Sequence, residues 1–187
     1  MKKHEKQALG CVTVMGAIGV TVIVAILTGW ATTIKNIVVL GTKGNDMVAL
    51  AKRTPYAPAA GACLSEAQVK AYLEVCRRVK PAGDKVDAWE EASKPAGRGG
   101  TPRFKGGAAG LVADYLRELK AALDDQHMGP SEFAWIGTRI ERAATPSPVP
   151  DKCAQPERAL CDRDAERIRA TRLGQHARRI AFGFAEN

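Results

Sequence analysis

The chain has 187 residues, a formal net charge of +8 and only 5% aromatic residues. Its basic excess lies mainly before Leu64, where seven Lys or Arg face two acids, whereas residues 64–187 carry 21 Lys or Arg and 18 Asp or Glu. Because nucleic-acid binding usually needs a concentrated basic face with aromatic side chains for stacking, this composition argues against nucleic acid as the main partner.

The first element in chain order is an uncharged stretch from Gln7 to Ile34. Its centre, Leu9–Trp30, would span roughly 33 Å as a helix, which is enough to cross a hydrocarbon core of about 30 Å. We therefore expect a basic N-terminal tail at 1–8 and a retained, single-pass transmembrane helix at 9–30. A removed signal peptide is the alternative, since Gly29 and Ala31 leave a small-x-small cleavage pattern.

Basic residues before the apolar run indicate its orientation. Lys2, Lys3 and Lys6 directly precede it, and the positive-inside rule then favours a cytoplasmic N-terminus. We expect the protein in the cell (inner) membrane, with its C-terminal domain extracytoplasmic. The reversed topology, with a reduced domain in the cytoplasm, is the alternative.

Four cysteines lie in this domain, namely Cys63, Cys76, Cys153 and Cys161. They form no CxxC motif and have no histidine at zinc spacing, so disulfides in an oxidising compartment are the simplest explanation. Cys63 and Cys76 bracket one predicted helix and lie too far apart to pair. We expect bridges from the first helix to the segment of Cys153 and Cys161, with a local Cys153–Cys161 bridge as the competing arrangement.

Residues 31–62 are expected to form a tether, because glycines and prolines interrupt them. The preceding helix could continue a little, as far as Leu40, until Gly41 and Gly44 weaken it, and a further turn is predicted at Met47–Ala51. The extracytoplasmic domain at 63–187 then opens with a helix that ends near Lys80, because Pro81 follows. Ser65 and Gln68 are spaced as a capping box at its start.

This opening, Leu64-Ser65-Glu66-Ala67-Gln68, resembles the Leu-Thr-x-x-Gln motif of periplasmic stress chaperones and metal sensors. The resemblance covers five residues, has Ser in place of Thr, and lacks the second copy that the family usually carries. It implies a helical, extracytoplasmic protein. A capping box explains the same residues, and we favour that interpretation.

The middle of the domain contains two well-patterned helices. A short helix at Asp84–Ser93 is followed by a Gly-rich basic loop at 94–107, which we interpret as a solvated connector. Ala108–His127 has one broad apolar face and predicts the strongest helix. Ser131 is expected to cap a helix that ends near Ala144, with Trp135 pointing away from the apolar face and packing on a neighbouring element.

A Pro-rich break at 145–151 precedes a helical stretch at 156–184. Its two halves carry apolar stripes on nearly opposite sides, which predicts a bend near Gly174 or two separate contacts. The second part also carries five arginines without an intervening acid, which could form a basic contact face for an acidic partner or anionic lipid. They are Arg167, Arg169, Arg172, Arg178 and Arg179.

No motif for nucleophilic, phosphate-binding or metal-dependent catalysis occurs in the sequence. The three histidines lie far apart, and the group Asp124, Asp125 and His127 reads as a solvated helix end, not a metal site. We therefore expect an all-α protein, not an enzyme, without a cofactor or metal: a membrane helix followed by a bundle of four to five helices. The expected role is non-catalytic interaction with a protein of the cell envelope. The alternative is a periplasmic ligand or metal sensor, or a stress-chaperone-like protein.

Overall fold

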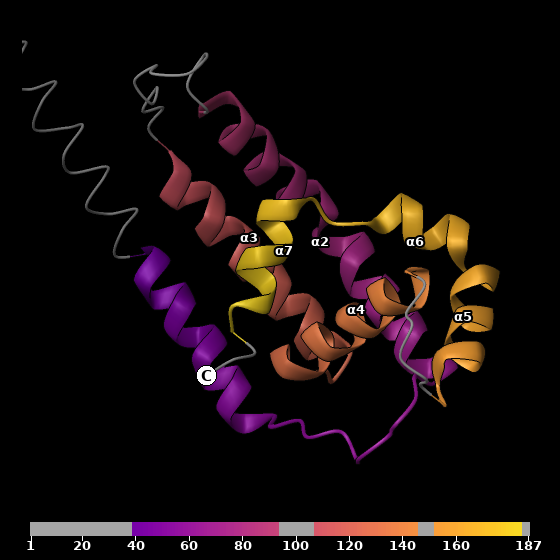
Figure 1. Cartoon of the computed structure of the whole chain (residues 1–187). Coiled ribbons are helices and arrows are strands. Elements are labelled where there is room, and N and C mark those ends of the chain that lie inside the picture. Colours follow the sequence, from indigo (N-terminus) through magenta and orange to yellow (C-terminus); the bar gives the residue numbers. More distant parts are fainter. Residues whose placement is uncertain (1–38, 94–106, 146–151, 185–187) are drawn as a thin grey trace, which may run out of the picture.

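The computed structural model describes residues 39–93, 107–145 and 152–184 (Figure 1). Over these ranges the secondary structure is all helical, which confirms the all-α class and a helical bundle. The domain from residue 63 onward has six described helices, where four to five were predicted. The helices are residues 39–53, α2 (Glu66–Ser93), α3 (Ala108–Asp125), α4 (Pro130–Ala144), α5 (Ala154–Arg163), α6 (Ala165–Thr171) and α7 (Gln175–Phe182).

Among these helices none is both long enough and apolar enough to cross a membrane. The predicted membrane helix at 9–30 lies outside the described residues, as do the N-terminal tail and most of the Gly-rich loop and of the Pro-rich break.

Helix α2 is the centre of the bundle. It packs against α3, α4, α6 and α7 (Figure 1). Its buried stripe includes Val69, Leu73, Val79 and Val86. The capping box at its start is present, because the Ser65 backbone N–H donates to Gln68 Oε1 and the Gln68 N–H donates to Ser65 Oγ.

The predicted end of this helix at Pro81 was wrong. Pro81 lies inside α2, and the short helix expected at Asp84–Ser93 is the second half of the same helix. A proline inside a helix costs about 3 kcal/mol. The apolar stripe continues in register across it, since Val86 is buried and Gly83 faces α7 so closely that a Cβ there would lie 3.1 Å from Ala177 Cβ. Tertiary packing therefore keeps the helix continuous.

Part of the expected tether belongs to the packed core. Residues 39–53 form one continuous helix, where an interruption at Gly41 and Gly44 and a single turn at Met47–Ala51 were predicted, and its Met47 and Leu50 are almost completely buried. Just beyond it, Thr54 lies so close to Gly129 that a side chain at 129 would overlap it. The irregular segment that follows, up to Leu64, then wraps along α4, where Tyr56 meets Trp135 with ring centroids 5.5 Å apart. The neighbour predicted for Trp135 is thus Tyr56.

The C-terminal helical stretch is broken where its two apolar stripes diverge. Arg172–Gly174 is extended between α6 and α7, which confirms the predicted break at Gly174. A second, unpredicted break falls at Asp164, between α5 and α6. These two breaks let Cys161, Leu173 and Ala177 all be buried in one core, which a straight helix could not achieve.

Candidate binding pocket

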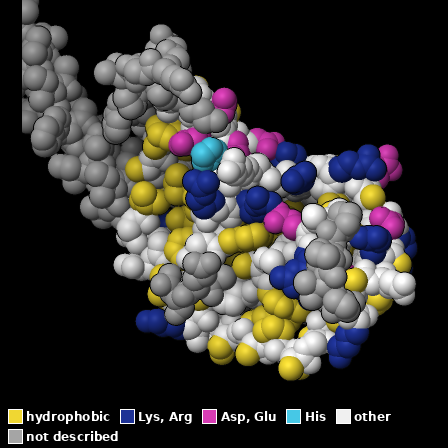
Figure 2. Space-filling model, in the orientation of Figure 1, with side chains coloured by type: hydrophobic (Ala, Val, Ile, Leu, Met, Phe, Trp, Pro, Cys, Tyr) yellow, Lys and Arg dark blue, Asp and Glu magenta, His cyan; other side chains and the backbone are white. Residues whose placement is uncertain are grey.

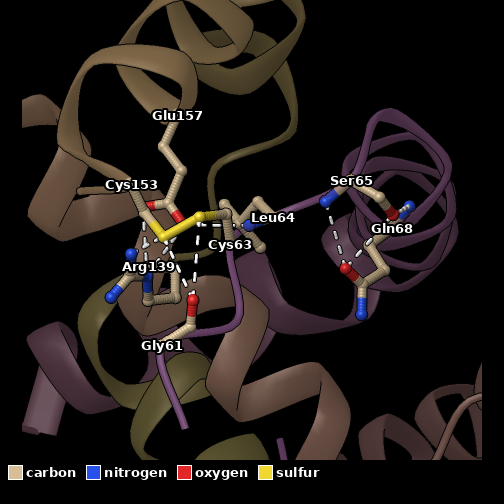
Figure 3. Close-up of a disulfide and its surroundings, with 8 residues drawn as sticks. All are labelled: Gly61, Cys63, Leu64, Ser65, Gln68, Arg139, Cys153 and Glu157. Atoms are coloured by element: carbon tan, nitrogen blue, oxygen red, sulfur yellow. Dashed lines mark hydrogen bonds and ion pairs between the residues drawn. A yellow bond between two sulfur atoms is a disulfide. The ribbon is translucent and has the colours of Figure 1, made fainter. Parts of the chain in front are cut away.

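A disulfide joins Cys63, which lies just before α2, to Cys153, which directly precedes α5 (Figure 3). Its Cα atoms are 5.2 Å apart, and the bridge closes a sequence separation of 90 residues. This pairing links the two segments that the sequence predicted to be linked, and the competing Cys153–Cys161 bridge is not formed. Cys76 and Cys161 are buried free thiols, so among the described cysteines there is one bridge where two were expected.

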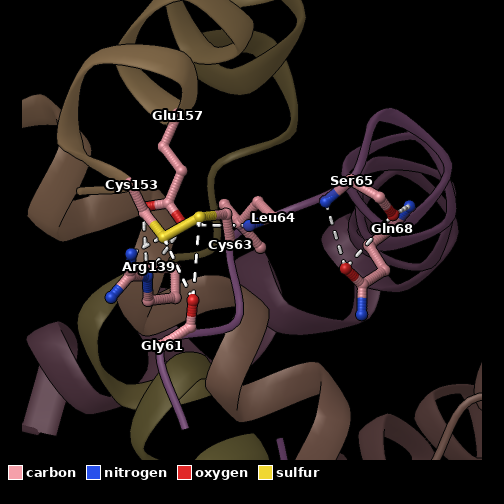
Figure 4. A network of polar contacts seen from close by, with 8 residues as sticks. All are labelled: Gly61, Cys63, Leu64, Ser65, Gln68, Arg139, Cys153 and Glu157. Carbon is pink, nitrogen blue, oxygen red and sulfur yellow. Dashed lines mark hydrogen bonds and ion pairs between the residues drawn. A yellow bond between two sulfur atoms is a disulfide. The ribbon is translucent and has the colours of Figure 1, made fainter. Parts of the chain in front are cut away.

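A buried ion pair lies beside the disulfide (Figure 3). Glu157 on α5 is 2% exposed, and its carboxylate lies 2.7 Å from the Arg139 guanidinium of α4. The same carboxylate accepts a hydrogen bond of 2.9 Å from the backbone N–H of Leu64 (Figure 4). Residues from three segments therefore meet at one carboxylate. This contact could not be predicted from the sequence, because Glu157 looks like an ordinary acidic residue in the first turn of a helix.

The five arginines predicted to form one basic face are distributed over separate elements. Arg167 and Arg169 lie on α6, Arg178 and Arg179 on α7, and Arg172 in the extended link between them. Two of them are already paired within the domain: Arg167 lies 3.0 Å from Asp164, and Arg178 contacts Glu141 of α4. Figure 2 accordingly shows basic side chains along α6 and α7 mixed with acidic ones, not a continuous basic surface.

Three of these arginines instead surround a pocket of about 500 Å³ between α2, α4, α5 and α6. Ligand pockets typically have volumes of roughly 300–1,000 Å³. Its apolar wall comes from four elements: Leu73 and Cys76 of α2, Ile140 of α4, Cys161 of α5, and Ile168 of α6 together with the following Leu173. Its polar lining includes Tyr72, Glu141, Thr145, Asp162, Arg169, Thr171, Arg172 and Arg178.

The groups deepest in this pocket are neutral. Burial raises the pKa of the Cys76 thiol to about 12, and burial also raises the pKa values of Tyr72 and Cys161. A thiol with a raised pKa carries little thiolate at neutral pH and is a poor nucleophile. The pocket therefore combines neutral, apolar side chains inside with charged side chains at its exposed edge.

A second, more polar pocket lies on the other side of the link between α6 and α7. It shares Arg172, Leu173 and Arg178 with the first and is otherwise lined by Lys80, Asp84, Asp87, Gly174 and Gln175. Asp87 is occupied structurally, because its Oδ1 accepts a hydrogen bond of 2.8 Å from the backbone N–H of His176. The polar residues of this pocket therefore lie at the contact between α2 and the start of α7.

His127, considered above as a metal ligand, lies exposed just after α3 with a φ of 51°. Within the described residues, no group of three or more His, Cys, Asp or Glu side chains is arranged to hold a metal ion.

Sequence reasoning singled out the three arginines of the pocket edge and the two buried thiols, but it did not predict that they line one pocket. They are Arg169, Arg172, Arg178, Cys76 and Cys161. The only signal was the pair of divergent apolar stripes after residue 156, which predicted the break at Gly174 but not the pocket. Comparison with protein-family models, curated proteins and solved structures finds no match for this chain.

Proposed function

We propose that this chain is a membrane-anchored, non-catalytic binding protein whose helical domain lies outside the cytoplasm and contacts a component of the cell envelope. The observation that carries the proposal is the Cys63–Cys153 disulfide, which holds the domain's entry segment against α5. Disulfides persist in oxidising compartments and are rare in the cytosol. The apolar run at 9–30 supplies the anchor, and the lysines before it favour this orientation.

The pocket supports a binding role within this proposal. It is concave, mostly apolar and edged by a few polar groups, which is the usual character of a small-molecule site. Its thiols have raised pKa values, which favours holding a ligand over transforming it. The same pocket also suits the second candidate function, a periplasmic ligand sensor, in which occupancy would be signalled to another envelope protein.

A pair of threonines offers a matched test. Thr171 lines the pocket, whereas Thr138 on α4 does not, and each donates its hydroxyl to the carbonyl four residues earlier in its own helix. Photo-reactive benzoylphenylalanine replaces Thr171 or Thr138 in the full chain in intact cells. After irradiation, the masses of the cross-linked adducts are measured by mass spectrometry. We expect a defined adduct at 171 that is absent at 138. Equal adduct patterns at both positions, or none at either, would contradict a binding role for the pocket.

A further inference from the structure

The rim of the pocket contains arginines that the rest of the domain does not neutralise. Arg178 is paired with Glu141. For Arg169 and Arg172, by contrast, the described part of the chain provides no carboxylate within ion-pair distance of the guanidinium. Asp162 is the one other acid in the lining, so three cations face two acids. An anion at the rim would therefore meet a net positive charge.

The interior of the same pocket calls for a different kind of group. Leu73, Ile140, Ile168 and Leu173 line it together with two uncharged thiols, and no charged side chain is contributed by α2. Apolar surface of this kind is stabilised by contact with an aliphatic chain, because both surfaces are removed from water. A free inorganic anion would leave this wall uncovered, and a neutral hydrocarbon would leave the two exposed arginines in contact with water alone.

We propose that the pocket binds a long-chain fatty acid, with its aliphatic chain against the apolar wall and its carboxylate between Arg169 and Arg172. A guanidinium presents paired N–H donors that match a carboxylate, so two of them can hold such a head group firmly. At about 500 Å³ the site suits one small amphiphile and not a folded partner. The inference rests on the proposed function, in which this pocket is a binding site, and adds the class of ligand.

The test uses the full chain reconstituted in lipid nanodiscs and a fatty acid that carries a photo-reactive diazirine in its chain. The matching fatty alcohol, which lacks the charge, is the first control. Labelled peptides are mapped by mass spectrometry, and labelling within residues 9–30 measures insertion from the bilayer. The variant R169E/R172E reverses the rim charge. R158E/R179E makes the same change of charge at two exposed arginines that do not line the pocket.

We expect the acid to label peptides of α2, α4 and α6 in the native chain and in R158E/R179E. In R169E/R172E this labelling should fall about tenfold or more, because two charge-assisted contacts are lost. The fatty alcohol should label the pocket of the native chain only weakly, at or below the level at which the fatty acid labels the pocket of R169E/R172E. Circular dichroism melts of both variants check that each one is folded.

Two results would overturn the inference, and they bear differently on the proposed function. If the fatty acid and the fatty alcohol label the pocket equally, and R169E/R172E changes neither signal, the pocket binds apolar groups regardless of head-group charge. The fatty-acid assignment is then wrong, and the proposed binding role still stands. If neither labels the pocket above the level at residues 9–30, the fatty-acid assignment is wrong. The adducts at Thr171 then decide separately whether the pocket binds anything else.

Discussion

Asp87 of α2 caps α7 from another helix, because its carboxylate accepts a hydrogen bond of 2.8 Å from the backbone N–H of His176. The N-cap residue of α7 itself is Gly174, which has no side chain to do so. Gly174 also lies so close to the Asp87 carboxylate that a Cβ there would overlap it. This hydrogen bond therefore helps to hold the start of α7, and with it one edge of the pocket, in place.

Asp87→Ala should consequently lower the free energy of unfolding by about 1–2 kcal/mol, the usual cost of removing a helix cap. Hydrogen exchange at the first amides of α7 should become faster. Asp84→Ala is the control, since Asp84 is exposed and only pairs with Lys80 within its own helix, which is worth about 0.5 kcal/mol or less. Equal losses for the two variants in urea unfolding would argue against the capping role.

Glu157→Ala should be far more damaging. It removes the acceptor of the Leu64 N–H and the Glu157 carboxylate that pairs with the Arg139 guanidinium, and breaking a buried ion pair costs about 3–5 kcal/mol. The double variant R139M/E157L should be more stable than Glu157→Ala, because it removes both charges together. Glu166→Ala, on the exposed side of α6, should stay within about 0.5 kcal/mol of the native chain. A loss below about 1 kcal/mol for Glu157→Ala would contradict this assignment.

Pro81→Ala should stabilise the protein by about 1–3 kcal/mol, because alanine restores a helical N–H and removes the steric clash of the ring inside α2. Pro156→Ala offers a comparison, since Pro156 lies in the first turn of α5, where proline is tolerated. Its effect should be within about 0.5 kcal/mol. If both substitutions are neutral in urea unfolding, Pro81 is not a weak point of α2.

The buried thiol of Cys76 predicts a loss of stability at alkaline pH. Its pKa rises from 9.0 to about 12 because burial disfavours the thiolate. Below pH 9 the thiol is protonated in both the folded and the unfolded chain and contributes no pH dependence. Between pH 9 and pH 12 the unfolded chain releases the proton first, so the free energy of unfolding falls by up to about 1.4 kcal/mol per pH unit.

The measurement is the slope of the unfolding free energy against pH, from pH 8 to pH 11, for the native chain and for Cys76→Ala. The variant should be less stable throughout, because it loses packing, but its slope should be shallower. Raised pKa values of Tyr72 and Tyr115 leave some slope above pH 10 in both proteins. Identical slopes would show that Cys76 ionises normally.

The disulfide should contribute about 2–5 kcal/mol, since it closes a long loop and removes freedom from the unfolded chain. The variant C63S/C153S should lose that amount. Reductant should lower the native chain to the level of the variant and leave the variant unchanged. A reductant effect that persists in C63S/C153S would mean that another bridge carries the stability.

Local patterns predicted the parts of this fold whose signals are local. The apolar face of α3, the Ser65–Gln68 capping box and the break at Gly174 can all be read within a few turns of chain. Pro81 misled because its local cost is outweighed by the burial of Val86 and the contact of Gly83 with α7, which involves residues about 90 positions away.

The same limit explains the site. Arg169, Arg172 and Cys76 were each singled out, but only the breaks at Asp164 and Arg172–Gly174 bring them around one hollow. Asp87 and Glu157 were missed because each acts on a backbone N–H about 90 residues away, and a lone carboxylate in a helix has no pattern that predicts such a partner.

The central claim, a disulfide-bonded domain outside the cytoplasm, is tested most directly by labelling intact cells with a membrane-impermeant maleimide. Cys63 is exposed, whereas Cys76 and Cys161 are buried, so Cys63 should report the state of the bridge. We predict labelling only after reductant treatment, and none above background in C63S/C153S. Labelling that appears only after lysis and needs no reductant would place a reduced domain in the cytoplasm and contradict the account.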